Sequence, residues 1–322
     1  SRRVHPEGFS MTKTTKVAYV FPGQGSQFPG MGRELYNNFT SSRAIFQQAD
    51  EVLKFPLSRL CFEGPEEELR LTINAQPALV TVSFAYLKAI SEITGTNKLP
   101  PPAFMAGHSL GEYTALAAAD VIDFTTVVYL ARERGRLMHE AGLRIPGGMA
   151  AIIGLDEILL NEVCKSTDTW ITNFNCPGQL TISGARENLT EAMGLAKAKG
   201  AARVVPLQVS GSFHSPLMQT AMEGLAQIIA KLTFRDPKVP IIANTTAQPL
   251  THGEQISTEL TTQLLNGVQW QRSIEFMISN GVSTFAEVGP GKVLTGLIKR
   301  INRNANILNI SDVLAVKNLE GS

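Results

Sequence analysis

The alternation of hydrophobic and polar positions predicts strands and helices in turn over the first half of the chain. The apolar run at residues 16–21, KVAYVF, predicts a buried strand, and residues 103–106 predict another. Helical periodicity follows over residues 33–54, 75–93, 112–119 and 124–141. Because strands that alternate with helices favour parallel pairing, this half predicts a parallel sheet covered by helices.

The pattern changes after Pro146 and predicts a smaller unit. Strands are expected at residues 148–153, 169–174, 179–183 and 202–207, and helices at 157–165 and 186–199. This β-α-β-β-α-β order is that of a ferredoxin-like subdomain. Asn175 to Gly178 predicts the turn of its central hairpin.

The larger unit resumes after the insertion. Helices are expected at residues 216–231, 259–265, 272–279 and, last, 292–300, with strands at 239–243 and 284–287. The 322 residues therefore predict an α/β protein in two parts. These parts are a large domain over 13–145 and 209–310 and a small one over 146–208. We expect residues 1–12 to be a leader or an expression-vector remnant without ordered structure.

Composition narrows the class of protein. Hydrophobic residues make up 43%, charged residues 18%, and the net charge is +1. These values are typical of a globular protein with a sizeable core and argue against a dedicated nucleic-acid binder. No apolar run reaches the roughly 18 residues of a membrane helix. The three separated cysteines predict reduced thiols in a cytoplasmic protein, without disulfides or a metal site.

The motif at residues 107–111, GHSLG, follows a predicted strand and precedes a predicted helix. In that context G-x-S-x-G indicates a nucleophile elbow, in which Ser109 is presented on a tight turn. The backbone N–H of Leu110 would then lie at a helix N-terminus, where positive partial charge collects. The structural alternative is a small-residue turn that lets a helix pack closely on the sheet.

A serine nucleophile needs a base, and the five histidines differ in context. His214 lies in a Gly/Ser-rich loop directly after the small unit, where a cleft residue is expected. His5 lies in the leader, His108 beside the nucleophile, His139 within a helix and His252 in a polar loop. The sequence therefore predicts His214 as the base.

Two further features suit an acyl-transfer site. The turn Gly23-Gln24-Gly25 lacks the third glycine of a dinucleotide-binding motif, since Phe28 stands there. We expect it to supply a backbone N–H to an oxyanion. Arg132 and Arg134 lie on the helix after the elbow helix, and one buried arginine would hold a substrate carboxylate. The alternative for both arginines is solvated surface charge.

These segments together resemble the malonyl-CoA:acyl carrier protein transacylases of fatty acid synthesis. The resemblance runs from about residue 16 to residue 300. It rests on VFPGQGSQ (20–27), GHSLGEY (107–113), RGRLM (134–138), FHSPLM (213–218), QLLNGVQW (263–270) and EVGPGKVLTGLIKR (287–300). The family implies an α/β hydrolase-like large domain with a parallel sheet and an inserted ferredoxin-like subdomain, in agreement with the two predicted units.

The resemblance also implies a role for each matching residue. Ser109 would be the nucleophile, and His214 the general base and then the acid. The backbone carbonyl of Gln263 would orient the His214 ring, so no carboxylate is needed. The backbone N–H groups of Gln24 and Leu110 would form the oxyanion hole.

Other matching residues would define the substrate. Arg134 would pair with the free carboxylate of the malonyl group, and Asn175, Gln179 and Phe213 would line the cleft. Leu110 after the serine and Phe213 before the histidine resemble the residues of malonyl-selecting relatives.

The implied function is ping-pong transfer of a malonyl group from malonyl-CoA to the phosphopantetheine thiol of acyl carrier protein, by a cytoplasmic monomer without a cofactor. Because acyl carrier protein is acidic, a basic docking patch is expected. Lys299 and Arg300 are the candidates, with Lys292 and Arg303 nearby. The alternative is an ordinary basic helix end that offsets the helix dipole.

Three other functions share part of these features. A typical serine esterase or thioesterase has the chain order Ser, Asp, His, but only His252 follows His214, and no aspartate precedes a glycine as in patatin-type lipases. A non-catalytic carrier-binding module would not need Ser109, His214 and Arg134 together. A free-standing acyltransferase of polyketide synthesis shares all of this chemistry, and the sequence does not separate it.

Overall fold

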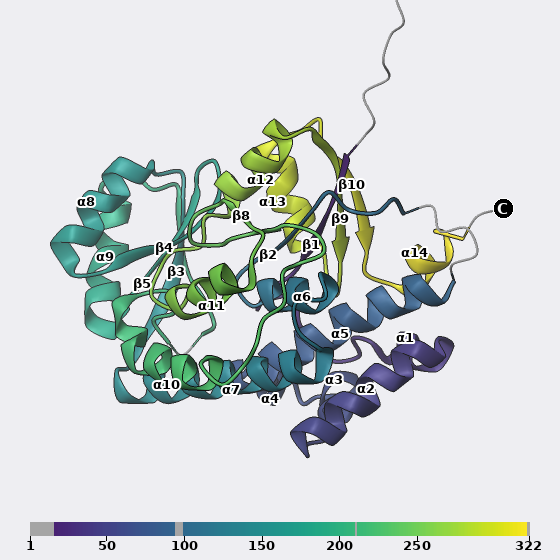
Figure 1. Ribbon diagram of the computed structural model, residues 1–322. Coiled ribbons are helices and arrows are strands. Elements are labelled where there is room, and N and C mark those ends of the chain that lie inside the picture. The colour runs from purple at the N-terminus through teal and green to yellow at the C-terminus, as the bar shows by residue number, and fades with distance from the viewer. Residues whose placement is uncertain (1–15, 94–98, 210, 321–322) are drawn as a thin grey trace, which may run out of the picture.

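The computed structural model describes residues 16–93, 99–209 and 211–320. Over these ranges the chain is a mixed α/β protein with one mainly parallel and one antiparallel sheet (Figure 1). The leader predicted over residues 1–12 lies outside the described residues.

The larger sheet is parallel except at one edge. Its strands are β1 (Lys16–Phe21), β2 (Phe104–Gly107), β7 (Ile241–Ile242), β8 (Pro249–Leu250), β9 (Val282–Val288) and β10 (Asn306–Ile310). Their order is β10-β9-β1-β2-β7-β8, and only β8 pairs antiparallel with its neighbour. The parallel sheet predicted from the alternating pattern is therefore confirmed.

Helices cover both faces of this sheet. They are α1 (Arg33–Asn38), α2 (Thr40–Leu53), α3 (Leu57–Glu63), α4 (Glu66–Arg70), α5 (Thr72–Glu92), α6 (Gly111–Ala118), α7 (Phe124–Arg144), the 3₁₀ turn η1 (Pro216–Met218), α10 (Gln219–Ile229), α11 (Gly253–Thr262), α12 (Trp270–Ser279), α13 (Val293–Ile301) and α14 (Val313–Lys317). Along β1, Val17, Tyr19 and Phe21 pack into one apolar cluster, and Ala18 and Val20 into another. Because alternate side chains point to opposite faces, burial on both explains the continuous apolar run.

The second sheet belongs to the inserted segment. Its elements are β3 (Gly147–Ile153), α8 (Glu157–Thr167), β4 (Trp170–Cys176), β5 (Gln179–Ala185), α9 (Arg186–Ala198) and β6 (Arg203–Pro206). The strand order is β4-β5-β3-β6, and every pair is antiparallel. Figure 1 shows α8 and α9 together at the outer side of this sheet, where they form a separate apolar core. The β-α-β-β-α-β order predicted from the sequence is confirmed.

Several element boundaries differ from the prediction. The helix predicted over 33–54 is broken at Phe39, whose backbone is extended. The helix predicted over 259–265 begins earlier, because His252 caps it and its Gln255 accepts the His252 N–H. Asn175 lies within β4 and not in the turn. The helix predicted last is followed by α14.

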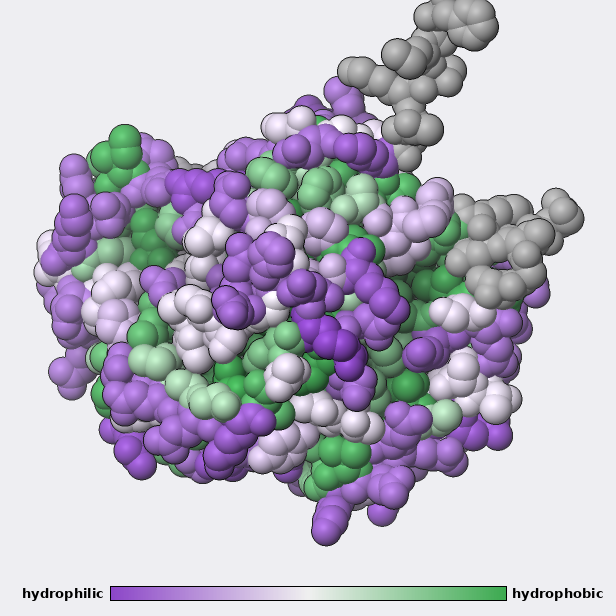
Figure 2. Space-filling view, viewed as in Figure 1, coloured by the Kyte–Doolittle hydropathy of each residue, from purple (hydrophilic) through white to green (hydrophobic). Residues whose placement is uncertain are grey.

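The surface of the described chain is mixed. Figure 2 shows hydrophilic residues over most of the outline of this face, with hydrophobic residues toward its middle and at a few places on its edge. None of the described helices is both long enough and apolar enough to cross a lipid bilayer.

Candidate active site

The loop between β2 and α6 presents Ser109 in a strained backbone conformation. Its φ of +51° lies in the left-handed region, which residues other than glycine rarely adopt. The flanking glycines are required by space, because a Cβ on Gly107 would lie 1.8 Å from the backbone of Gly111. A Cβ on Gly111 would in turn lie 2.1 Å from the Phe21 carbonyl oxygen. The predicted strand-turn-helix context of Ser109 is confirmed.

The imidazole of His214 lies between Ser109 and a backbone carbonyl. Its Nε2 atom is 2.7 Å from the Oγ atom of Ser109, and its Nδ1 atom is 2.8 Å from the carbonyl oxygen of Gln263. Because a carbonyl only accepts, Nδ1 donates, which leaves Nε2 to accept the serine proton. Burial and the charge of Arg134 lower the pKa of His214 to about 3. The ring is therefore a free base at neutral pH.

The guanidinium of Arg134, on α7, is buried beside the serine and is only 1% exposed. Its Nη1 donates to Oε1 of Gln76 at 2.6 Å, and its Nη2 to Oε1 of Gln263 at 2.8 Å. Nη2 also lies 3.3 Å from the Oγ atom of Ser109. Within the described ranges Arg134 forms no ion pair, and its Nε has no hydrogen-bond partner. The guanidinium can therefore still form an ion pair with an anion.

Neighbouring arginines on α7 have other surroundings. Pro77 inside α5 lacks an N–H, so the carbonyl of Ile73 has no helical donor. Arg132 Nη1 donates to that carbonyl at 3.0 Å. The prediction that one arginine of this helix lies inside the site therefore holds for Arg134, whereas Arg132 stabilises the proline-interrupted turn.

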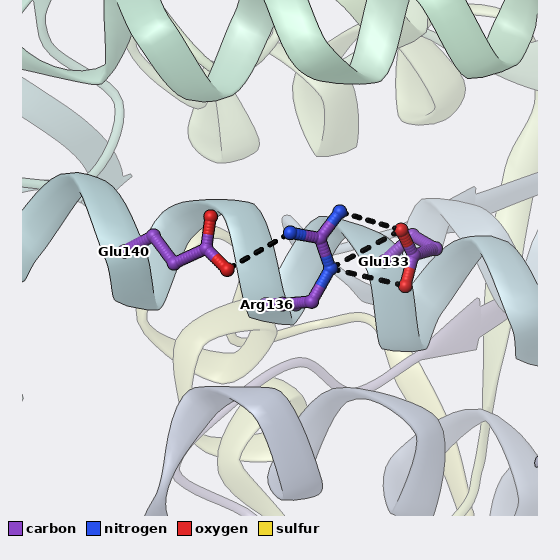
Figure 3. A network of polar contacts seen from close by, with 3 residues as sticks. All are labelled: Glu133, Arg136 and Glu140. Carbon is purple, nitrogen blue, oxygen red and sulfur yellow. Dashed lines mark hydrogen bonds and ion pairs between the residues drawn. The ribbon is translucent and has the colours of Figure 1, made fainter.

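Arg136 completes the series on the surface. Its guanidinium lies between Glu133 and Glu140 of the same helix, with nitrogen–oxygen distances of 2.7 Å and 2.8 Å (Figure 3). Exposed pairs of this kind contribute only about 0.2–1 kcal/mol each. Three arginines at alternate positions of one helix thus lie in three different environments.

Buried side chains that the sequence did not reveal hold the elbow. Asn244 accepts from the backbone N–H of Ser109 at 2.7 Å and donates to the carbonyl of Gly107 at 2.7 Å. Nε2 of Gln263 donates to the Ser109 carbonyl at 3.1 Å and to Glu112 at 2.6 Å. Burial and the nearby carboxyl of Glu259 raise the pKa of Glu112. Glu112 lies within the GHSLGEY block, which was the one available signal.

Two backbone N–H groups near the serine are unused. In the part of the chain that the structure describes, the N–H groups of Gln24 and Leu110 have no hydrogen-bond acceptor. Both residues line the same cavity as Ser109. The side chain of Gln24 is fixed by Thr72, whose hydroxyl donates to Oε1 at 2.9 Å. These groups are positioned to meet a developing negative charge.

A cavity of about 420 Å³ opens over the serine and is lined by residues of both units. Asn175, Gln179 and Phe213 line it, as the sequence led us to expect. Asn175 Oδ1 is 2.8 Å from Nε2 of His108, which joins the small sheet to the elbow. The cavity is therefore lined by strands of the smaller sheet on one side and by loops and helices around the larger sheet on the other.

The basic turn of α13 lies beside this cleft. Arg300 Nη1 donates to Oε1 of Gln179 at 2.6 Å, and Gln179 lines the cavity. Lys299 donates to the carbonyl oxygens of Ala305 and Arg303 at 2.6 Å and 3.5 Å. The ammonium therefore stabilises the turn that follows α13, which ends at Ile301. A docking role for the two residues stays a prediction.

The other features of the chain do not compete for this site. His252 is exposed and caps α11, with its Nδ1 3.6 Å from a carboxylate oxygen of Asp236. No cluster of three or more His, Cys, Asp or Glu side chains suited to a metal ion occurs among the described residues. The thiols of Cys61, Cys164 and Cys176 are buried and unpaired.

Acyl transfer through a serine requires a base for the hydroxyl proton and N–H donors for the oxyanion. Both are present at the end of the parallel sheet, beside a buried arginine, and they define an acyl-transferring enzyme. The chain belongs to the family described as "Acyl transferase domain", whose model matches residues 18–316. It is 46% identical over 303 residues to the malonyl CoA-acyl carrier protein transacylase of Bacillus subtilis (strain 168), covering 92% of this chain and 94% of that protein.

Solved structures agree with this assignment. The acyl-carrier-protein-S-malonyltransferase of Bartonella henselae superposes with a TM-score of 0.90 at 40% identity, over 94% of this chain and 98% of that chain. A second similar structure is described as a type II PKS acyl-carrier protein in complex with its malonyl-transacylase. It has a TM-score of 0.91 at 39% identity and covers 95% of this chain and 99% of that one.

Proposed function

We propose that this protein transfers the malonyl group of malonyl-CoA to the phosphopantetheine thiol of acyl carrier protein. The observation that carries the proposal is the buried guanidinium of Arg134, which lies 3.3 Å from the Oγ atom of Ser109 and forms no ion pair with any carboxylate of the described residues. An acyl group with a free carboxylate satisfies that charge while its thioester carbon meets the serine. The names of the relatives, transacylases of malonyl groups, support the same substrate.

The first half-reaction forms a malonyl ester of Ser109. Nε2 of His214 removes the hydroxyl proton as Oγ attacks the thioester carbon. The N–H groups of Gln24 and Leu110 stabilise the oxyanion of the tetrahedral intermediate. His214 then returns the proton to the sulfur as the carbon–sulfur bond breaks, and CoA leaves.

The second half-reaction reverses this chemistry with another thiol. The phosphopantetheine thiol gives its proton to His214 and attacks the ester carbon, and the proton returns to Ser109 as the ester bond breaks. The carbonyl of Gln263 keeps the ring in the required tautomer throughout, so the pair needs no carboxylate. Water is the competing acceptor in this step.

The division of the chain into two domains is part of the same proposal. We assign residues 13–145 and 209–310 to an α/β hydrolase-like domain and 146–208 to a ferredoxin-like subdomain, with the cleft between them. The observed strand orders support the division. We also expect a monomer in the cytoplasm, since buried, unpaired thiols suit a reducing compartment.

The rates of malonyl transfer to two carrier proteins show whether the enzyme serves fatty acid synthesis or polyketide synthesis. Fatty acid synthesis is the main assignment, and polyketide synthesis is the second, because one similar structure holds a type II PKS acyl-carrier protein. Purified enzyme and malonyl-CoA should be mixed with each phosphopantetheine-bearing carrier and the malonyl-carrier product followed by mass. A higher kcat/KM with the fatty acid carrier supports the main assignment. Rapid release of free malonate without any carrier would instead indicate a hydrolase.

A further inference from the structure

Glu112, in the first turn of α6, is a carboxyl that no step of the proposed reaction uses. Its side chain is fully buried, with 0% exposure. Three N–H groups reach its two oxygens. They are Nε2 of Gln263 at 2.6 Å and the backbone N and Nδ2 of Asn244 at 3.0 Å and 3.2 Å. A buried carboxyl is costly, so its presence behind the nucleophile calls for a function.

The Glu112 carboxyl fixes the orientation of two side-chain amides. An amide group has a donor end and an acceptor end of nearly the same shape, and its neighbours decide the orientation. Because Glu112 accepts, Nε2 of Gln263 turns toward it, and Oε1 turns to Nη2 of Arg134 at 2.8 Å. In the same way Nδ2 of Asn244 faces Glu112, which leaves Oδ1 to accept from the Ser109 N–H at 2.7 Å.

One of these amides also helps to set the direction of a backbone N–H. The carbonyl oxygen of Ser109 accepts from Nε2 of Gln263 at 3.1 Å and from the backbone N–H of Glu112 at 3.1 Å. The Ser109 carbonyl and the Leu110 N–H belong to one planar trans peptide and point in opposite directions. Holding the carbonyl therefore aims the N–H that would stabilise the oxyanion.

We infer that Glu112 is a positioning residue, which orients the Gln263 and Asn244 amides and through them the Leu110 N–H and the guanidinium of Arg134. The inference rests on the proposed function, because it assigns those two groups their roles. It has two consequences. Losing the acceptor slows acylation by any acyl group through the N–H, and it lowers the preference for malonyl groups through Arg134.

Glu112→Gln tests this inference with a matched control in Glu287→Gln. Glu287, on β9, is also 0% exposed, and its carboxyl accepts from the N–H groups of Leu294 and Thr295, not from Gln263 or Asn244. Single-turnover acylation by malonyl-CoA and acetyl-CoA is measured with the Tm of each variant. We expect Glu112→Gln to lose about 10²-fold with malonyl-CoA, the scale of an ångström-sized misplacement, and less with acetyl-CoA. Glu287→Gln should keep the wild-type ratio.

Wild-type rates and ratio in Glu112→Gln overturn the inference, as does an equal loss in both variants with an equal fall in Tm. If Glu112→Gln does not fold, Glu112→Asp is measured, which keeps the acceptor on a shorter side chain. A lowered malonyl-to-acetyl ratio in it supports the inference, and a wild-type ratio overturns it. Failure of the wild type to form a malonyl-serine overturns the proposed function as well, so the two failures are distinguishable.

Discussion

The Nη2 atom of Arg134 lies 3.3 Å from the Oγ atom of Ser109, so a buried positive charge adjoins the proposed nucleophile. The guanidinium is held by neutral amide oxygens of Gln76 and Gln263 and lies over the ring of Tyr113, 5.4 Å from its centroid. Burial lowers the pKa of Arg134. A site of this kind favours a substrate that supplies the missing negative charge at a fixed distance from the reacting carbon.

Replacing Arg134 should therefore change which acyl group reacts. An acetyl group leaves the buried charge unpaired, a penalty of about 2–5 kcal/mol, and removing the charge removes that penalty. We expect Arg134→Ala to lose malonyl acylation by roughly 30-fold or more and to gain acetyl acylation relative to malonyl. Rates of acyl-serine formation from the two CoA esters measure both changes.

Arg136→Ala is the matched control for that substitution. It removes an arginine of the same helix whose partners, Glu133 and Glu140, are on the surface. Its acylation rates and malonyl preference should equal those of the wild type. Unchanged malonyl selectivity in Arg134→Ala would remove Arg134 from its assigned role.

The neutral state of His214 predicts an unusual pH dependence. Its pKa is lowered to about 3 by burial and by the charge of Arg134, so the base is already unprotonated well below neutral pH. The rate of malonyl-serine formation should stay nearly constant from pH 8 to pH 5. A loss of about tenfold per pH unit below 6.5, the ordinary histidine value, would contradict this account. Circular dichroism at each pH confirms that the protein remains folded.

The same shift affects stability with a definite sign. Between about pH 3 and pH 6.5 the unfolded chain binds a proton at residue 214 that the native chain does not. The contribution of His214 to the free energy of unfolding should therefore fall as pH falls below 6.5, by up to about 1.4 kcal/mol per pH unit. His108, whose pKa burial also lowers, acts in the same direction. Glu112, Glu259 and Glu287, whose pKa values burial raises, act in the opposite direction. Urea unfolding of wild type and His214→Gln at pH 7, 6 and 5 isolates the contribution of residue 214. The stability of the wild type relative to the variant should fall with pH, and a constant difference would contradict the shift.

The strands and the elbow could be predicted from the sequence because their signals are local. The run at residues 17–21 is apolar throughout, and G-x-S-x-G requires only a strand before it and a helix after it. The short helices α3 and α4 were missed, and α11 was misplaced. Helices of 5–10 residues depend on packing and caps more than on periodicity.

Ser109 and His214 could be predicted from motif and context, but the side chains that hold the site residues in place could not. Asn244 meets Ser109 across 135 positions of sequence, and Gln76 meets Arg134 across 58. Nothing in the local sequence marks either contact, because it exists only once the sheet has formed. The same holds for the exposed Lys299, whose partners are carbonyls beyond the end of its own helix.

Alanine should have opposite effects at two glycines, one in the elbow and one in a helix. A Cβ on Gly107 would lie 1.8 Å from the backbone carbon of Gly111, so Gly107→Ala should prevent the native turn and abolish soluble, folded protein. A Cβ on Gly194, in α9, meets nothing within 4 Å. Gly194→Ala should stabilise the protein by about 0.5–1 kcal/mol, because alanine loses less backbone freedom in a helix. Thermal unfolding checks both, and a folded, active Gly107→Ala would contradict the description of the elbow.

Charge reversal on α13 tests the carrier-protein docking prediction. Arg300→Glu and Lys299→Glu should raise the KM for acyl carrier protein and leave malonyl-serine formation from malonyl-CoA unchanged, because an acidic partner would be repelled. Lys165→Glu, in the last turn of α8, is the control with the same charge change at another helix end. Equal KM values in all three variants would take α13 out of the docking surface.

The malonyl-serine ester is the central intermediate of the proposed reaction, and intact-protein mass spectrometry detects it. Wild type and Ser109→Ala are mixed with malonyl-CoA or acetyl-CoA and then with acyl carrier protein. We predict one malonyl adduct on the wild type, little acetyl adduct, none on Ser109→Ala, and discharge of the malonyl group onto the carrier. A malonyl adduct that survives in Ser109→Ala, or transfer to the carrier without any adduct on the wild type, would contradict the proposed reaction.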